Sequence, residues 1–122
     1  KLTVEPESQP YISNGEHFAK VAKQYPEAVI IHGHIGGGGD WLWSLKAMAD
    51  SPNVFTDISG SVHDAEIIET TYKMMGADRM LFGTDMSFAS SLGKILGANI
   101  PDQDKIKILN NPRFQKYLER GA

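Results

Sequence analysis

The stretch AVIIHGHIGGGGDWLWSLKAMADSPNVFTDIS, residues 28–59, decides the fold. Its first part, AVIIHGHI at residues 28–35, is a short apolar run that predicts a buried strand. The segment DWLWSLKAMAD predicts a helix, with Asp40 at the position of an N-cap. Pro52 then interrupts the chain before VFTDIS, residues 54–59, a second predicted strand. A strand, a helix and another strand in this order are typical of a parallel sheet.

The same alternation continues on both sides of this unit. Before it stand a short extended candidate and a helix that begins with a capping-box-like Ser13-x-x-Glu16. These two elements are the strand LTVEP (2–6) and the helix 13–25. After the unit, the sequence predicts a strand RMLFGTD (79–85) and helices at 64–76, 90–99, 101–111 and 112–121. We therefore expect one α/β domain over residues 1–122, in which strands and helices alternate.

Composition excludes several classes of function. The chain has 122 residues, a formal net charge of −3 and no basic block, which argues against nucleic acid or an anionic membrane surface as a partner. There is no cysteine, so disulfides, cysteine-ligated zinc and thiol catalysis are excluded. No apolar run reaches the length of a membrane-spanning helix. These features lead us to expect a cytoplasmic protein.

Polar residues gather where the predicted strands end. They are Glu5 after the first strand, His32 and His34, Asp57 and Ser59, and Thr84 and Asp85. Ligands of parallel α/β proteins bind at the carboxyl ends of the strands, in open sheets and in closed barrels alike. The sequence therefore predicts a functional site at this edge of the sheet.

His32 and His34 are candidate metal ligands. Two positions apart on a strand, they would point to the same face, where an aspartate from a neighbouring strand end could share a cation with them. Imidazole with carboxylate suits zinc, and also manganese, iron or nickel. The alternative is that one histidine is a core residue bonded to the backbone. An aspartate at position 85, directly after an apolar strand, needs a cation or several donors if buried; otherwise it caps the turn near Ser87.

The four glycines that follow His34 do not form a phosphate loop. They lack the Gly-Lys-Ser/Thr ending of a Walker motif, and their spacing does not fit the dinucleotide fingerprint. We expect Gly36 and Gly37 to let the backbone turn tightly beside a substrate pocket. Trp41 is either a core residue or a substrate contact at the pocket mouth. Asp57 and Ser59 are expected to form a hydrogen-bonded pair that fixes the pocket, with Ser59 on its wall.

Three segments in this order and spacing resemble a known family. YPEAVIIHGHIGG with a following Trp, SPNVFTDISGS and MGADRMLFGTDMSF are similar to the C-terminal half of the amidohydrolase superfamily. The nearest group is the amidohydrolase 2 type, which includes the aminocarboxymuconate-semialdehyde decarboxylase-like enzymes. The tail DKIKILNNPRFQKYL resembles the helix that follows in that family.

The resemblance implies a (β/α)8 barrel with a mononuclear metal site. The segments at residues 28–37, 53–60 and 79–85 would be its sixth, seventh and eighth strands, so that the chain would hold about four of eight βα units. His34 would match the sixth-strand histidine that contacts the metal-bound water or acts as acid and base. Asp85 would match the eighth-strand metal ligand and proton acceptor. Glu5 stands roughly where the fifth-strand histidine is expected, and the first-strand His-x-His would lie upstream.

Two functions remain open from the sequence. The first is a metal-dependent hydrolase that acts on a C–N or C–O bond of a small molecule, or a decarboxylase of a small carboxylic acid, with zinc as the expected metal. His34 and Asp85 would be catalytic, and His32 and Glu5 would be further ligands. The second is a non-catalytic half-barrel module for assembly or small-ligand binding. A half barrel has open sheet edges, so we expect self-association or pairing with an N-terminal half. An open nucleotide-binding sheet would need a phosphate loop, which is missing.

Overall fold

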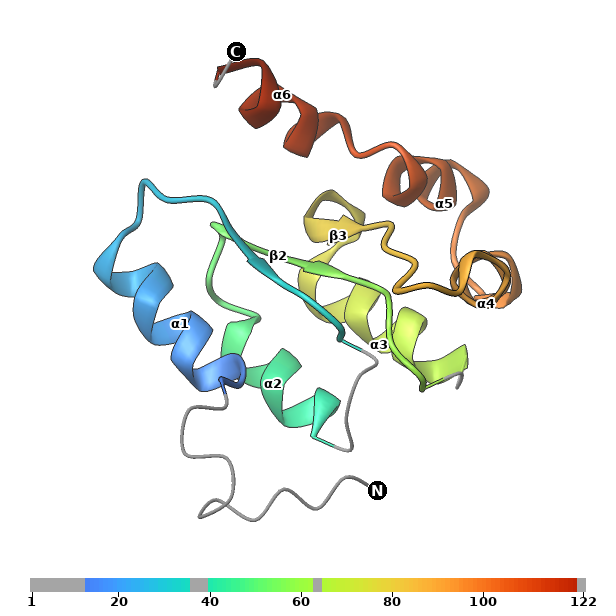
Figure 1. The fold of residues 1–122 in the computed structure, drawn as a ribbon, viewed down its shortest axis with the longest axis horizontal. Coiled ribbons are helices and arrows are strands. Elements are labelled where there is room, and N and C mark those ends of the chain that lie inside the picture. Colours follow the sequence, from blue (N-terminus) through green and yellow to red (C-terminus); the bar gives the residue numbers. More distant parts are fainter. Residues whose placement is uncertain (1–12, 36–39, 63–64, 121–122) are drawn as a thin grey trace.

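The structure, a computed structural model, describes residues 13–35, 40–62 and 65–120 (Figure 1). It contains a parallel sheet of three strands in the order β1-β2-β3. The strands are β1 Ile30–His32, β2 Val54–Asp57 and β3 Met80–Leu81. The strand predicted at residues 2–6, with Glu5, lies outside the described residues.

Helices separate the strands as the sequence predicts. They are α1 Gly15–Gln24, α2 Trp41–Met48, α3 Ala65–Met75, α4 Phe88–Gly97, α5 Asp102–Leu109 and α6 Pro112–Arg120, with a 3₁₀ turn η1 Ala77–Arg79 before β3. The predicted mixed α/β class is confirmed for the part of the chain that is described. None of these helices is long and apolar enough to cross a membrane.

One face of the sheet packs against the main hydrophobic core. The register aligns His32 with Thr56 and Thr56 with Met80, so these three side chains lie in one row. Val54 and Met80 from this face, with Ile58 just beyond β2, are fully buried. The core around them is built from helical residues, including Ala22, Leu45, Met48, Ile67, Ile68, Met75, Ile95 and Ile108.

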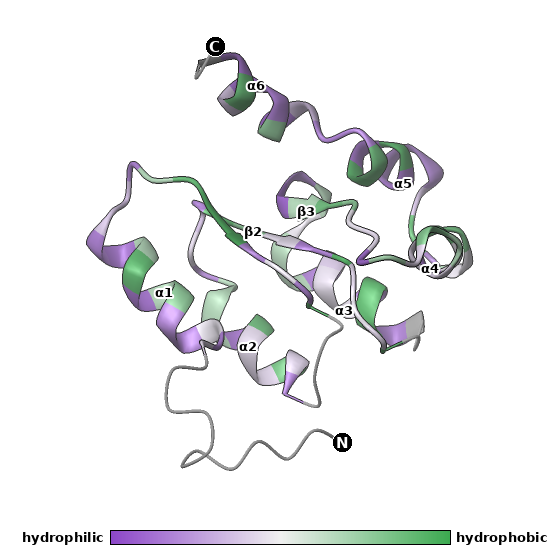
Figure 2. Cartoon of the chain, in the orientation of Figure 1, coloured by the Kyte–Doolittle hydropathy of each residue, from purple (hydrophilic) through white to green (hydrophobic). Residues whose placement is uncertain are grey.

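The opposite face of the sheet is partly covered by α6. Phe55 is fully buried there, with its ring centroid 5.5 Å from that of Phe114 and 5.9 Å from that of Tyr117. Ile31, the register neighbour of Phe55 on β1, is 44% exposed. Figure 2 shows hydrophobic residues along β1 and alternating hydrophobic and hydrophilic residues around α6. The apolar part of this face, at Phe55 and Ile31, is therefore only in part buried.

Two helix starts differ from the sequence prediction. Helix α1 is capped by Asn14, not Ser13, because the Oδ1 of Asn14 accepts hydrogen bonds from the amides of Glu16 and His17 at 3.1 and 3.3 Å. Asp40 is the N-cap residue of α2 as predicted, yet its side chain makes no capping hydrogen bond. Its φ of −101° and ψ of 11° depart from the extended backbone of a capping residue.

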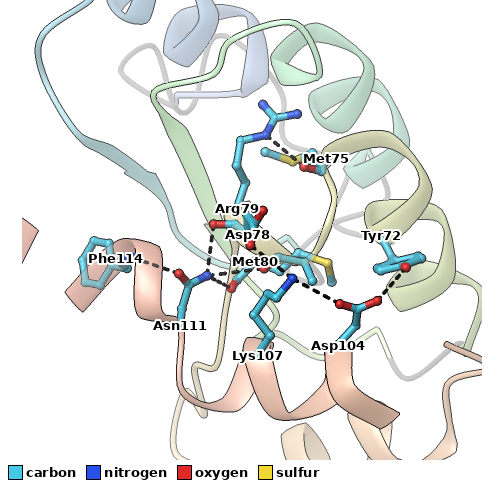
Figure 3. A network of polar contacts seen from close by, with 10 residues as sticks. Tyr72, Met75, Asp78, Arg79, Met80, Asp104, Lys107, Asn111 and Phe114 are labelled. Atoms are coloured by element: carbon cyan, nitrogen blue, oxygen red, sulfur yellow. Dashed lines mark hydrogen bonds and ion pairs between the residues drawn. The ribbon is translucent and has the colours of Figure 1, made fainter. Parts of the chain in front are cut away.

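The C-terminal helices are fastened to the start of β3 through Asn111 (Figure 3). The buried Nδ2 of Asn111 donates to the carbonyl oxygens of Ala77, Asp78 and Met80 at 3.3, 3.1 and 2.8 Å. Its Oδ1 accepts from the amide of Phe114 at 2.9 Å and so caps α6. One amide side chain therefore fixes both the entry to β3 and the helix that covers Phe55.

A second polar cluster holds α5 against α3 and η1 (Figure 3). The hydroxyl of Tyr72 donates to Asp104 Oδ2 at 2.8 Å. The Nζ of Lys107 lies 3.3 Å from Asp104 and 3.4 Å from Asp78. This cluster joins three elements at the start of β3, so we assign it a structural role.

Candidate functional site

The described strand ends lie side by side at one edge of the sheet. Beyond the regular ladder, the amide of Ile35 donates to the carbonyl of Asp57 at 3.3 Å, and the amide of Ile58 donates to that of Leu81 at 3.1 Å. These bonds keep the chain segments after β1, β2 and β3 together. The polar residues of these segments therefore meet at the carboxyl edge, as expected of a parallel sheet.

The side chains of His34 and Asp85 lie against each other across this edge. The Nε2 of His34 lies 3.5 Å from Oδ1 of Asp85. Their side chains are 52% and 44% exposed, so the pair is open to solvent. The sequence predicted both residues as catalytic and metal-binding, and the structure brings them together from the outer strands of the sheet.

The backbone at the pair is unusual. Within the described ranges, the non-glycine residues with positive φ are His34 at 61°, Asp85 at 40° and Met86 at 67°. A left-handed conformation costs an L-residue about 1–2 kcal/mol, and such strain concentrates at functional sites. Two of these three residues are His34 and Asp85 themselves. The strained backbone therefore lies at the same carboxyl edge of the sheet as the polar side chains.

We predict that Met86→Gly stabilises the protein. The side chain of Met86 is fully exposed, so its removal costs no packing, whereas glycine accepts the positive φ without strain. After subtracting the greater entropy of glycine in the unfolded chain, we expect the free energy of unfolding to rise by about 0.5–1 kcal/mol. Urea denaturation measures the change. Leu96→Gly, at an exposed position in the last turn of α4, should instead lower it by up to about 1 kcal/mol.

Asp57 supports the backbone of His34. Its Oδ1 accepts hydrogen bonds from the amide of His34 at 3.1 Å, from the amide of Ser59 at 2.8 Å and from the hydroxyl of Ser59 at 2.5 Å. The hydrogen-bonded pair of Asp57 and Ser59 predicted from the sequence is confirmed. Ser59 is 2% exposed and its hydroxyl proton is directed at Asp57, so contact between Ser59 and a substrate stays a prediction.

Gly83 leaves room for Asp57 beside the pair. A Cβ atom at position 83 would lie 3.0 Å from both Cβ and Cγ of Asp57. Since Asp57 already binds the amide of His34, a side chain at position 83 would push on the residue that holds the pair. Gly83, two residues before Asp85, therefore allows this close packing.

His32 has a different environment from His34. It is 8% exposed, its Nδ1 lies 3.3 Å from Oγ1 of Thr56, and its ring packs edge-on against Phe18 at 4.8 Å. Strand β1 ends at His32, and the positive φ of His34 turns the chain away from the extended path. The expectation that both histidines point to one face of a strand is therefore wrong, and the role of His32 as a metal ligand stays a prediction.

Burial makes His32 a source of acid sensitivity. Desolvation lowers the pKa of His32 below its ordinary value of 6.5, although the nearby charge of Asp57 partly opposes this. The unfolded chain then binds the proton more readily, so stability is complete above about pH 6.5 and falls as the pH drops through that value. We predict that His32→Gln flattens the decline between pH 7.5 and 5, measured by urea denaturation. Equal pH slopes for the two proteins would contradict it.

The other predicted site residues are only partly placed. Trp41 opens α2 and is partly buried against the core. Three further predicted site residues, Glu5, Gly36 and Gly37, lie outside the described residues. Among the residues that are described, no group of three or more histidine, aspartate or glutamate side chains could hold a metal ion. A metal site built on His34 and Asp85 would therefore need further donors.

Sequence reasoning missed one buried charge near the site. Lys94 of α4 is 6% exposed, and its Nζ donates to the carbonyl oxygens of Ile58 and Gly60 at 2.7 and 3.0 Å. The signal was present in the helix pattern, since Ser91, Lys94, Ile95 and Ala98 share one buried stripe. A lysine on that stripe needs polar partners, which the segment after β2 provides.

The comparisons with known proteins identify a family. A family model described as Amidohydrolase matches residues 13–111, which include the three strands and both members of the His34–Asp85 pair. No curated protein matches the chain. No solved structure matches it either.

Proposed function

The chain belongs to the amidohydrolase family, of the amidohydrolase 2 type, and on this premise we propose that it carries the catalytic edge of a metal-dependent hydrolase. The reaction would be hydrolysis of a C–N or C–O bond in a small molecule, or decarboxylation of a small carboxylic acid. The observation that supports this most is the His34–Asp85 pair, 3.5 Å apart at the carboxyl edge of the sheet.

The arrangement of the strands supports a closed barrel as the parent fold. Neighbouring strands are consecutive in the chain and all parallel, as in a (β/α)8 barrel. A doubly wound sheet would instead reverse its strand order at the ligand site. We propose that β1, β2 and β3 are the sixth, seventh and eighth strands of such a barrel, and that the chain is its C-terminal half, with about four of the eight βα units.

The donors at the edge fit part of a metal site. An imidazole nitrogen and a carboxylate oxygen are ligands that zinc, manganese and iron accept, and both side chains face solvent. Such a cation would lower the pKa of a bound water to about 7 and polarise a substrate carbonyl. Further ligands would come from Glu5, from His32, or from a His-x-His strand in another part of the barrel.

His34 and Asp85 would divide the proton transfers between them. The Nε2 of His34 can donate or accept a proton at the substrate, because its ring is half exposed. Oδ1 of Asp85, 3.5 Å away, is placed to accept a proton or to hold the histidine ring in position. We propose that Gly36, Gly37, Trp41 and Ser59 line the pocket for a small-molecule substrate.

A second candidate is a half-barrel module without catalysis. It is favoured by the described residues, which bring no third metal donor to the pair. In both cases β1 and β3 are the edge strands of the sheet formed by the described residues, and these edges and the half-exposed Ile31 need cover. We propose that the missing strands come from an N-terminal half or from a second copy of the chain.

The experiment that separates the two candidates uses the coding sequence upstream of Lys1. The hydrolase proposal predicts that this upstream sequence encodes, in frame, a strand with His-x-His. The longer protein that joins this strand to residues 1–122, called the continuous protein below, should lose activity in a chelator and regain it with Zn²⁺. Esters, amides and small carboxylic acids would be the substrate panel. An upstream region without such a strand, or a continuous protein that turns over none of the panel, would favour the half-barrel module.

A further inference from the structure

Lys94 is the least expected charge in the described core. Its side chain is 6% exposed, on the stripe of α4 that also carries Ile95. A buried ammonium loses its hydration, which costs several kcal/mol unless good partners replace the water. Consistent with this, burial lowers the pKa of Lys94, while the charge of Asp57 opposes that shift. An apolar residue would pack on this stripe without such a cost, so the charge needs another explanation.

The partners of Lys94 identify what it holds. Its Nζ donates to the carbonyl of Ile58 at 2.7 Å and to that of Gly60 at 3.0 Å. These carbonyls stand on either side of Ser59, and Gly60 has a φ of +105° that turns the chain there. Lys94 therefore holds residues 58–60, the short segment that follows β2 and contains Ser59.

That segment is linked through Asp57 to the His34–Asp85 pair. The amide and the hydroxyl of Ser59 both donate to Oδ1 of Asp57, at 2.8 and 2.5 Å. The same Oδ1 accepts the amide of His34 at 3.1 Å. A shift of the Ser59 segment would therefore move the acceptor that holds His34 in its left-handed conformation beside Asp85.

We propose that Lys94 is a positioning residue for the His34–Asp85 pair. It clamps residues 58–60 through two carbonyl oxygens, and thereby fixes the carboxylate of Asp57 under the amide of His34. Helix α4 begins shortly after Asp85, so one helix braces the pair from both β2 and β3. An effect of Lys94 on catalysis rests on the proposed function, whereas its effect on the position of His34 does not.

The amide of His34 reports this geometry directly. In Lys94→Met, the two carbonyls lose their donor, and we expect the hydrogen bond from His34 to Asp57 to weaken. Hydrogen exchange of the His34 amide, followed by ¹⁵N NMR, should become roughly tenfold faster, since a weaker hydrogen bond to the charged acceptor opens more often. Lys73→Met, at an exposed position of α3, should leave the His34 amide unchanged.

Chemical rescue separates the charge from the volume of the side chain. The chain has no cysteine, so Lys94→Cys introduces a single thiol. Alkylating the unfolded variant with 2-bromoethylamine rebuilds a lysine-like ammonium, and 1-bromopropane gives a neutral chain of the same length. After refolding, the form made with 2-bromoethylamine should restore the wild-type chemical shift and hydrogen-exchange rate of the His34 amide. The form made with 1-bromopropane should not.

The outcomes are distinct from those that test the hydrolase. If the His34 amide is the same in Lys94→Met and wild type, or in the two alkylated forms, the positioning role is overturned. A Lys94→Met chain that does not fold would also overturn it, because Lys94 would then support the whole core. None of these results depends on metal or turnover, so the proposed function could fail while the positioning role holds.

Discussion

Asp85→Asn is expected to weaken binding of Zn²⁺ to the chain by at least roughly tenfold, and to abolish metal-dependent turnover in the continuous protein. Asparagine keeps the size of the side chain but removes the negative charge that would hold the cation. Even partners that only orient a metal ligand cost about 10–100-fold in affinity when removed, and a ligand should cost no less. Competition with a chromophoric chelator measures the affinity for Zn²⁺. Because the side chain of Asp85 is 44% exposed, the fold should tolerate the substitution.

Asp102→Asn is the matched control for this prediction. The side chain of Asp102 is 93% exposed in the first turn of α5, where it pairs with Lys105. The same loss of one negative charge should leave Zn²⁺ affinity within about twofold of wild type, because exposed charges act weakly at a distance. If the two variants bind Zn²⁺ equally well, Asp85 is not a ligand, and the metal chemistry proposed for this edge must lie elsewhere.

Gly15→Ala is expected to cause the largest loss of stability. Gly15 begins α1 where this helix crosses α2, and a Cβ atom there would lie 2.3 Å from the carbonyl oxygen and 2.4 Å from the Cα of Ser44. The obstacle is backbone, so the two helices must separate, and the hydrogen bond from the Gly15 amide to Ser44 Oγ is lost. We expect the free energy of unfolding to fall by about 3 kcal/mol, at the upper end for overpacked sites.

Gly93→Ala provides the control with the opposite sign. Gly93 lies inside α4, and a Cβ atom there would meet nothing within 4 Å. Since alanine favours a helix interior over glycine, this variant should gain about 0.5–1 kcal/mol. Urea denaturation of both variants at one pH gives the comparison. A Gly15→Ala protein as stable as wild type would show that α1 and α2 do not cross closely.

The periodic features of the chain could be predicted from its sequence. Apolar runs at residues 28–35 and 54–59 predicted strands, and both contain one, although β1 and β2 are shorter than these runs. The alternation with helices gave the parallel class, and parallel strands bring their ends to one edge. His34 and Asp85 could therefore be placed at a common edge without any contact being visible in the sequence.

Features set by tertiary contacts were not predictable in this way. Periodicity treats residues 32 and 34 as equivalent, but the backbone of His34 is left-handed and only His32 enters the packing against Phe18. The predicted strand at 79–85 shrinks to Met80–Leu81, since the chain leaves the ladder to reach the turn at Asp85. Gly15 against Ser44, and Lys94 under the Ser59 segment, depend on neighbours distant in sequence.

The most direct test of the metal-binding pair is a Zn²⁺ titration of the chain labelled with ¹⁵N in its histidine rings. The ring nitrogens of His34 should shift first as Zn²⁺ is added, the buried ring of His32 should respond less, and Asp85→Asn should remove the His34 response. Ring signals of His34 that stay unmoved up to millimolar Zn²⁺, or that move equally in Asp85→Asn, would contradict a metal site built on His34 and Asp85.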